Sequence, residues 1–196
     1  LSGEERPNIR ANEATGDGGN LSIETGQLTV GEGAEVSVSA RGSGAAGNLQ
    51  IRAETVALNN RGVITTTTAS GQGGNIILQV GSLQLRDRSQ TAAEAGGSGN
   101  GGNIAIASDT LVLQPGSRIN ANAFQGTGGR IAVTTQGIFV SPNSAITASS
   151  QFGVAGVVTV NTPNVNNSTG LVELPNQLED PSDRILVGCT AAEGNS

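Results

Sequence analysis

Carboxylates are the side chains of this sequence that could do chemistry. There are sixteen Asp and Glu residues, one Cys and no His. Catalytic triads and histidine metal sites are therefore excluded, and a single Cys cannot build a zinc site. Paired carboxylates could still cleave a glycosidic bond. The acids are scattered, however, with Glu24, Glu54 and Asp109 at strand borders or turns and Glu32 and Glu35 in a loop, so we expect no catalytic residue and no cofactor.

An acidic cluster near the end of the sequence is the one candidate for a metal ion. Glu179, Asp180 and Asp183 stand in the segment Glu-Asp-Pro-Ser-Asp, and their oxygens are of the kind that Ca²⁺ prefers. The sequence lacks the Gly-rich nonapeptide of calcium-binding β-rolls. A solvated acidic turn accounts for the cluster better, and we expect no metal site.

Short polar side chains form a second candidate site, on the outer face of one set of strands. Such a face could hydrogen-bond carbohydrate, although small polar residues are also what any solvated sheet face tolerates. The run of four Thr at 65–68 is similar to ice-binding solenoids, but these need the same Thr in coil after coil, and here the positions vary. The candidate face comprises Ser37, Ser39, Thr65, Thr67, Asn120, Asn122, Thr147 and Ser149.

A repeated phrase predicts the framework that positions these side chains. It returns six times at a spacing of 27 or 28 residues, for example as Gly-Gly-Asn-Leu-Ser-Ile at 18–23 and Gly-Gly-Asn-Ile-Ala-Ile at 101–106. A period of this length with β-type residues is typical of a stacked solenoid.

Apolar residues alternate in three sets within each repeat. Counted from Asn20 and its equivalents, they fall at positions 1 and 3, at 8 and 10, and at 16, 18 and 20, which is the period of a strand with one face inward. Turn residues such as Pro115-Gly116 separate the sets. The sequence predicts an all-β, right-handed parallel β-helix with three strands per 27–28-residue coil. We expect about six coils over 1–170, starting in mid-coil, and a C-terminal capping segment over 171–196.

Asn recurs at the start of four consecutive coils, as Asn20, Asn48, Asn75 and Asn103. These side chains could form an amide ladder along the stack, each bonding the next. Alternatively, Asn simply suits the geometry of the turn. The Gly residues just before them would supply backbone angles that other residues resist.

The composition of the sequence excludes further classes of function. A net charge of −6 and a pI near 4.6 oppose nucleic-acid binding, and no apolar run approaches the length of a membrane span.

Cys189 has no partner within the sequence; a free thiol, a buried residue and an intermolecular bridge all remain open. The sequence does not begin with Met, and Ile9 and Ala11 match the third set of a coil. We therefore expect a fragment of a longer secreted protein.

The repeat resembles filamentous-haemagglutinin-like exoproteins of two-partner secretion systems, of the cyanobacterial type. The resemblance lies in Gly-Gly-Asn-Leu-x-Ile, followed by Gly-Gln-Leu-Thr-Val (26–30) and Ala-Glu-Val-Ser-Val-Ser-Ala (34–40). The stretches Leu-Pro-Asn-Gln-Leu-Glu-Asp-Pro-Ser (174–182) and Ile-Leu-Val-Gly-Cys (185–189) are similar to the C-terminal end of those proteins. The resemblance implies a right-handed parallel β-helix, export through an outer-membrane β-barrel transporter, and a role in adhesion at the cell surface.

We therefore expect a non-catalytic structural or adhesive segment of a secreted or cell-surface protein. Its expected partners are surface glycans or matrix polysaccharide, the β-barrel transporter for the parent protein, and other copies of the chain through end-to-end or lateral association. The alternative is a carbohydrate-binding or carbohydrate-processing β-helix, which an acidic pair facing a groove would favour.

Overall fold

The structure is a computed structural model that describes residues 16–163. This part of the chain consists of strands and turns and contains no helix. The capping segment over 171–196, Cys189, the acidic cluster over 179–183 and the expected strand at Ile9 and Ala11 lie outside the described residues.

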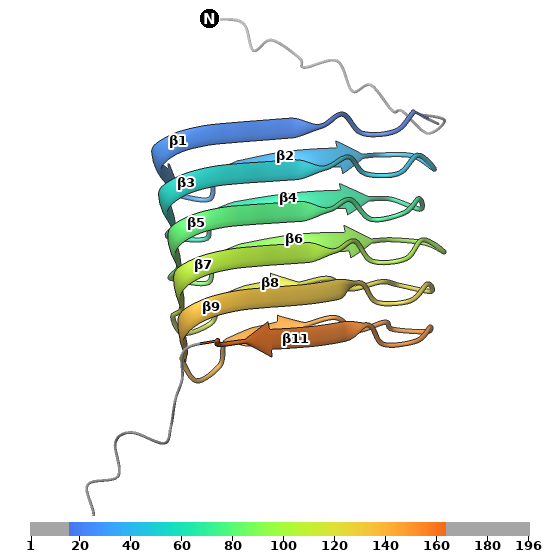
Figure 1. The fold of residues 1–196 in the computed structure, drawn as a ribbon. Coiled ribbons are helices and arrows are strands. Elements are labelled where there is room, and N and C mark those ends of the chain that lie inside the picture. The colour runs from blue at the N-terminus through green and yellow to red at the C-terminus, as the bar shows by residue number, and fades with distance from the viewer. Residues whose placement is uncertain (1–15, 164–196) are drawn as a thin grey trace, which may run out of the picture. The chain divides into compact units, whose positions relative to one another are not determined.

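Each coil contributes one long strand to a first sheet and one short strand to a second sheet (Figure 1). Every strand pairs in parallel with the equivalent strand of the next coil, so neighbouring partners are 27 or 28 residues apart. The long strands are β1 (Leu21–Val30), β3 (Leu49–Leu58), β5 (Ile76–Leu85), β7 (Ile104–Leu113), β9 (Arg130–Val140) and β11 (Val157–Asn161). The short strands are β2 (Glu35–Ala40), β4 (Val63–Thr68), β6 (Gln90–Ala95), β8 (Arg118–Asn120) and β10 (Ala145–Thr147).

The predicted parallel β-helix is confirmed. In Figure 1 the long strands run leftward in front and the short strands return behind them while the chain descends, which makes the coil right-handed. The described residues form about five turns, with β11 beginning one more, slightly fewer than the six coils expected.

The first two expected strands of each coil form one continuous element. Pairing runs from Leu21 to Thr25, skips Gly26, and resumes at Gln27 against Thr55. The same single interruption recurs in the other long strands. The inward-facing positions change from Ile76, Leu78 and Val80 to Leu83 and Leu85 across the skipped residue, so the first two apolar sets lie on either side of a bend within one long strand.

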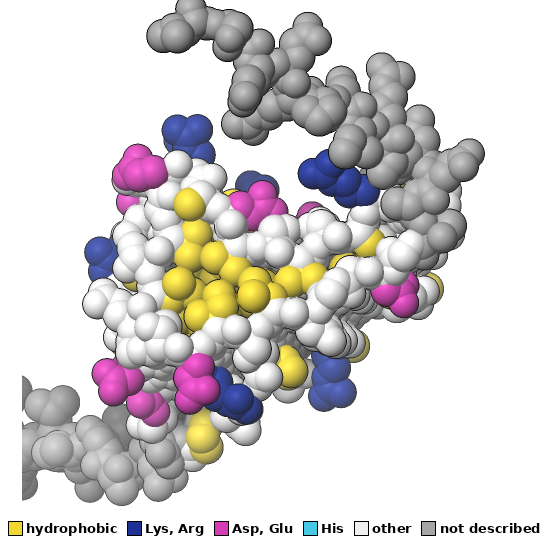
Figure 2. Space-filling model, turned by 90° about the horizontal axis from the view of Figure 1, so that it is seen from above, with side chains coloured by type: hydrophobic (Ala, Val, Ile, Leu, Met, Phe, Trp, Pro, Cys, Tyr) yellow, Lys and Arg dark blue, Asp and Glu magenta, His cyan; other side chains and the backbone are white. Residues whose placement is uncertain are grey.

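The core is a column of Leu, Ile and Val between the two sheets. In the middle coils these side chains are fully enclosed, as at Leu49, Leu83 and Ile119, each 0% exposed. In the last described coil Val158 is 40% exposed, and within residues 16–163 its strand β11 pairs on one side only, with β9. Figure 2, which looks onto the first coil, shows the same core from its other end as a hydrophobic area ringed by polar and charged side chains.

Glycine is required at the Gly-Gly corner because successive coils touch there. A Cβ on Gly47 would lie 1.7 Å from the carbonyl oxygen of Gly19, far inside van der Waals contact. Gly47 does not have a positive φ, so the unusual backbone angles expected from the sequence are not the reason for this glycine. Positive φ occurs instead in the turns between the long and short strands, for example at Asn60 and Gly116.

Candidate functional site

Six of the eight polar residues predicted on the outer face lie in strands of the second sheet, and Asn122 and Ser149 follow β8 and β10. The sunken middle of this face, from Thr65 to Asn120, is called the trough. Strand register places one residue of each coil in a single central column. Adjacent coils lie about 4.8 Å apart, so this column extends for about 19 Å. Its members are Ser37, Thr65, Ala92, Asn120 and Thr147.

The middle of this column is sunken, unlike the flat solvated face expected from the sequence. Thr65 is 5% exposed, Ala92 1% and Asn120 7%. Gln90 and Glu94 lie two residues to either side of Ala92 on β6, so strand alternation puts their longer side chains on the same face of the sheet. Among the other predicted residues, Ser37, Ser39 and Ser149 are exposed, while Thr67, Asn122 and Thr147 are half-buried.

The trough deepens around β8 into a hollow of about 640 Å³. One wall is formed by Gln90 and Arg118, which are partners in the strand register. The opposite wall is formed by Glu94 and Asn122. The hollow therefore combines one carboxyl group, one guanidinium group and several amides.

Hydrogen bonds fix the amides of the hollow. Thr147 Oγ1 donates to Asn120 Oδ1 at 3.1 Å. Asn122 Oδ1 accepts from Ser149 N at 2.9 Å and from Ser149 Oγ at 3.0 Å, and Asn122 Nδ2 lies 3.5 Å from Glu94 Oε1. Because these bonds join neighbouring coils, they hold the amides in place before any ligand arrives.

Glu94 is the titrating group of the hollow. Burial removes water from its carboxylate and raises the pKa of Glu94 above its ordinary value of 4.5, while hydrogen bonds from Asn122 and Asn120 oppose that rise. No second carboxyl group lines this hollow within the described residues. Glycoside hydrolysis requires two, so this hollow provides groups for binding but not for that reaction.

The structure brings together three acids that are scattered in the sequence. Glu24, Glu54 and Asp109 border a depression on the outer face of the first sheet, around Gly81. All three are exposed, and Asp109 Oδ1 accepts a hydrogen bond from Gln136 Nε2 at 2.9 Å. Among residues 16–163 no group of acids, Cys or His is arranged to hold a metal ion. This depression is open and solvated, and lacks the enclosure of the trough.

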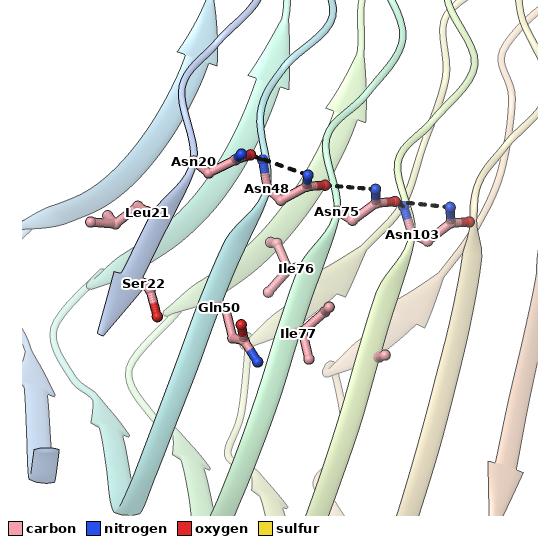
Figure 3. Close-up of a pocket in the computed structure, with 10 residues that line it drawn as sticks. Asn20, Leu21, Ser22, Asn48, Gln50, Asn75, Ile76, Ile77 and Asn103 are labelled. Atoms are coloured by element: carbon pink, nitrogen blue, oxygen red, sulfur yellow. Dashed lines mark hydrogen bonds between the residues drawn. The ribbon is translucent and has the colours of Figure 1, made fainter. Parts of the chain in front are cut away.

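The four recurring asparagines form an amide ladder at the start of the long strands, as Figure 3 shows. Asn48 Nδ2 donates to Asn20 Oδ1 at 3.1 Å, Asn75 Nδ2 to Asn48 Oδ1 at 2.8 Å, and Asn103 Nδ2 to Asn75 Oδ1 at 2.9 Å. Asn103 Oδ1 in turn accepts from the backbone N–H of Arg130 at 3.1 Å. The ladder groups bond one another and the backbone of the next coil, so their role is structural.

Comparison with protein-family models, with characterised proteins and with solved structures yields no match. Within the described residues no helix is both long and apolar enough to cross a membrane.

Proposed function

We propose that these coils are a non-catalytic structural and adhesive segment of a secreted or cell-surface protein of the filamentous-haemagglutinin-like type. The observation that supports this role is the uniform stacking of the coils. Two parallel sheets and a column of close glycine contacts pass from coil to coil with little change, and the amide ladder joins the first four coils. A repeat that contacts only its neighbours can be lengthened without altering its cross-section, which suits a scaffold that holds other parts away from a surface.

The proposed partners follow from the sequence resemblance. The parent protein would be exported by an outer-membrane β-barrel transporter, and its coils would meet surface glycans or matrix polysaccharide outside the cell. Association of copies is favoured by apolar side chains exposed on the last described coil, among them Phe152, Val154 and Val157, which are 68%, 70% and 58% exposed. Exposed apolar groups that lie close together usually mark contact surfaces.

The scaffold role can be tested by duplicating one coil. Inserting a second copy of residues 75–102 after position 102 should preserve cooperative unfolding and lengthen the stack by about 4.8 Å, as measured by small-angle X-ray scattering. The matched control carries the same inserted residues in scrambled order, and should unfold at a lower temperature than the parent chain. Loss of folding in the duplicated chain would contradict the scaffold role.

A second candidate function is carbohydrate binding, and the polar hollow of about 640 Å³ on the second sheet favours it. Carbohydrate processing has less support, because a single carboxyl group lines that hollow and the depression bordered by Glu24, Glu54 and Asp109 is open and solvated. Ice binding also has little support, since the central column changes from Ser37 to Thr65, Ala92 and Asn120 in successive coils.

A further inference from the structure

We propose that the trough of the second sheet binds a neutral, hydroxyl-rich oligosaccharide, with Glu94 and Arg118 as its principal contacts and the sugar chain running along the stack. This inference rests on the adhesive part of the proposed function and gives it a ligand class and a location.

The shape of the trough fits an extended chain of sugar rings. Its floor crosses the strands in one column, through Thr65, Ala92 and Asn120. The backbone positions of the two walls, at Gln90 and Glu94, are four residues apart on one strand and therefore about 13 Å apart. A floor of small side chains between walls of longer ones leaves room for a ligand that lies across successive strands.

A buried polar side chain faces this space. Asn120 is 7% exposed and lines the hollow. Its Oδ1 accepts from Thr147, whereas its Nδ2 carries two protons, of which one is directed to Glu94. The other can be donated to a ligand. In a core this amide would be costly to bury, so its place in the floor of an open hollow is consistent with a polar ligand.

The walls add polar groups that have no hydrogen-bond partner among residues 16–163. Within the described residues, the side chains of Gln90 and Arg118 form no hydrogen bond, although both line the hollow. Gln90 can donate and accept, and Arg118 presents a planar set of donors. Sugar hydroxyls also both donate and accept hydrogen bonds, so they match this mixture of groups better than a ligand that can only donate or only accept.

Charge argues for a neutral ligand. The hollow holds one carboxyl group and one guanidinium group on opposite walls, so its formal charges cancel and neither an anion nor a cation is favoured overall. An anionic sugar would place negative charge beside Glu94, which has already lost part of its water. No aromatic ring lines the hollow within the described residues, so binding would rest on hydrogen bonds alone. Each site would then be weak, and repeated copies at a surface would strengthen attachment through avidity.

The test uses the full chain labelled with ¹⁵N, titrated with cellotetraose, xylotetraose and chitotetraose, and with tetragalacturonate as an anionic probe. We expect at least one neutral sugar to shift the side-chain amide resonances of Gln90, Asn120 and Asn122. Glu94→Gln and Arg118→Ala should each weaken binding about tenfold, the loss expected for one charge-assisted hydrogen bond. Glu54→Gln and Arg52→Ala, the matched changes on the first sheet, should leave binding unchanged.

Three results would overturn the inference: absence of shifts with every neutral sugar, binding of tetragalacturonate alone, or unchanged affinity in both trough variants. The coil-duplication experiment separates this inference from the scaffold role. A duplicated chain that folds and lengthens but binds no sugar retains the scaffold role and removes the trough as a binding site. If the parent chain binds sugar but the duplicated chain does not fold, the trough is retained as a binding site and the scaffold role is contradicted.

Discussion

The carbonyl oxygen of Gly74 lies 1.7 Å from the position that a Cβ on Gly102 would occupy. These two residues are equivalent positions of successive coils, and the contact leaves no space for any side chain. The same contact recurs from coil to coil, with Gly47, Gly129 and Gly156 facing the glycine of the preceding coil. Close backbone approach, repeated in every coil, therefore sets the packing at this corner of the solenoid.

Replacing Gly102 by Ala should push two coils apart. We expect Gly102→Ala to lower the free energy of unfolding by about 2–4 kcal/mol, as overpacked backbone contacts do, measured by urea denaturation. Gly26→Ala is the matched control, because a Cβ at Gly26 meets nothing within 4 Å. That variant should stay within about 0.5 kcal/mol of the parent chain. Equal effects of the two substitutions would contradict the close-contact explanation.

The amide ladder should contribute measurably to stability although it is exposed. Asn75 donates to Asn48 and accepts from both the side chain and the backbone N–H of Asn103. Asn75→Ala should therefore lower the free energy of unfolding by about 1–2 kcal/mol, since it removes several hydrogen bonds of modest net value. Gln50→Ala, which removes an amide that forms no hydrogen bond within the described part of the chain, serves as control and should change stability by about 0.5 kcal/mol or less.

Two neighbouring threonines on the inner face of β4 should respond in opposite ways. Within residues 16–163, Thr66 Oγ1 is buried without a hydrogen-bond partner, so Thr66→Val should raise the free energy of unfolding by about 1 kcal/mol. Thr68 Oγ1 donates to Gly44 O at 2.8 Å and accepts from Gly71 N at 3.1 Å. Thr68→Val should lower it by about 1–2 kcal/mol. Thermal unfolding measures both, and a loss of stability in the two variants alike would count against this assignment.

Glu94 should make stability depend on pH. Burial raises its pKa in the folded chain above the ordinary value of 4.5, so the folded state binds its proton more tightly than the unfolded state does. The resulting stabilisation is complete below pH 4.5 and is lost as pH rises through the folded-state pKa of Glu94. Relative to the parent chain, Glu94→Gln should therefore become progressively more stable as pH increases through this window.

The hydrogen bond from Asn122 provides the control for that measurement. It lowers the pKa of Glu94, so Asn122→Ala should raise this pKa further and shift the loss of stability to higher pH. Denaturant unfolding at a series of pH values compares the three chains. A constant difference between the parent chain and Glu94→Gln at all pH values would show that Glu94 titrates normally.

Much of the candidate site could be inferred from the sequence, but its depth could not. The repeat assigns Thr65 and Asn120 to the outer side of their strands, because strand alternation assigns each residue to a face. It does not predict that both are almost enclosed. Their exposure depends on the lengths of neighbouring side chains such as Gln90 and Glu94, which lie beside the central column only after the coils have stacked.

The sequence alone determined the solenoid, because residues at a fixed spacing of 27 or 28 must occupy equivalent places in successive coils. It also determined which asparagines align and which apolar residues form the core. The tertiary structure decided that the first two apolar sets share one strand and that glycine at 47 and 102 serves close backbone contact. It also decided that the polar face is a trough. A periodic pattern specifies the coil and the face on which a residue lies. The shape of the coil in cross-section depends instead on contacts between residues that are far apart in the sequence.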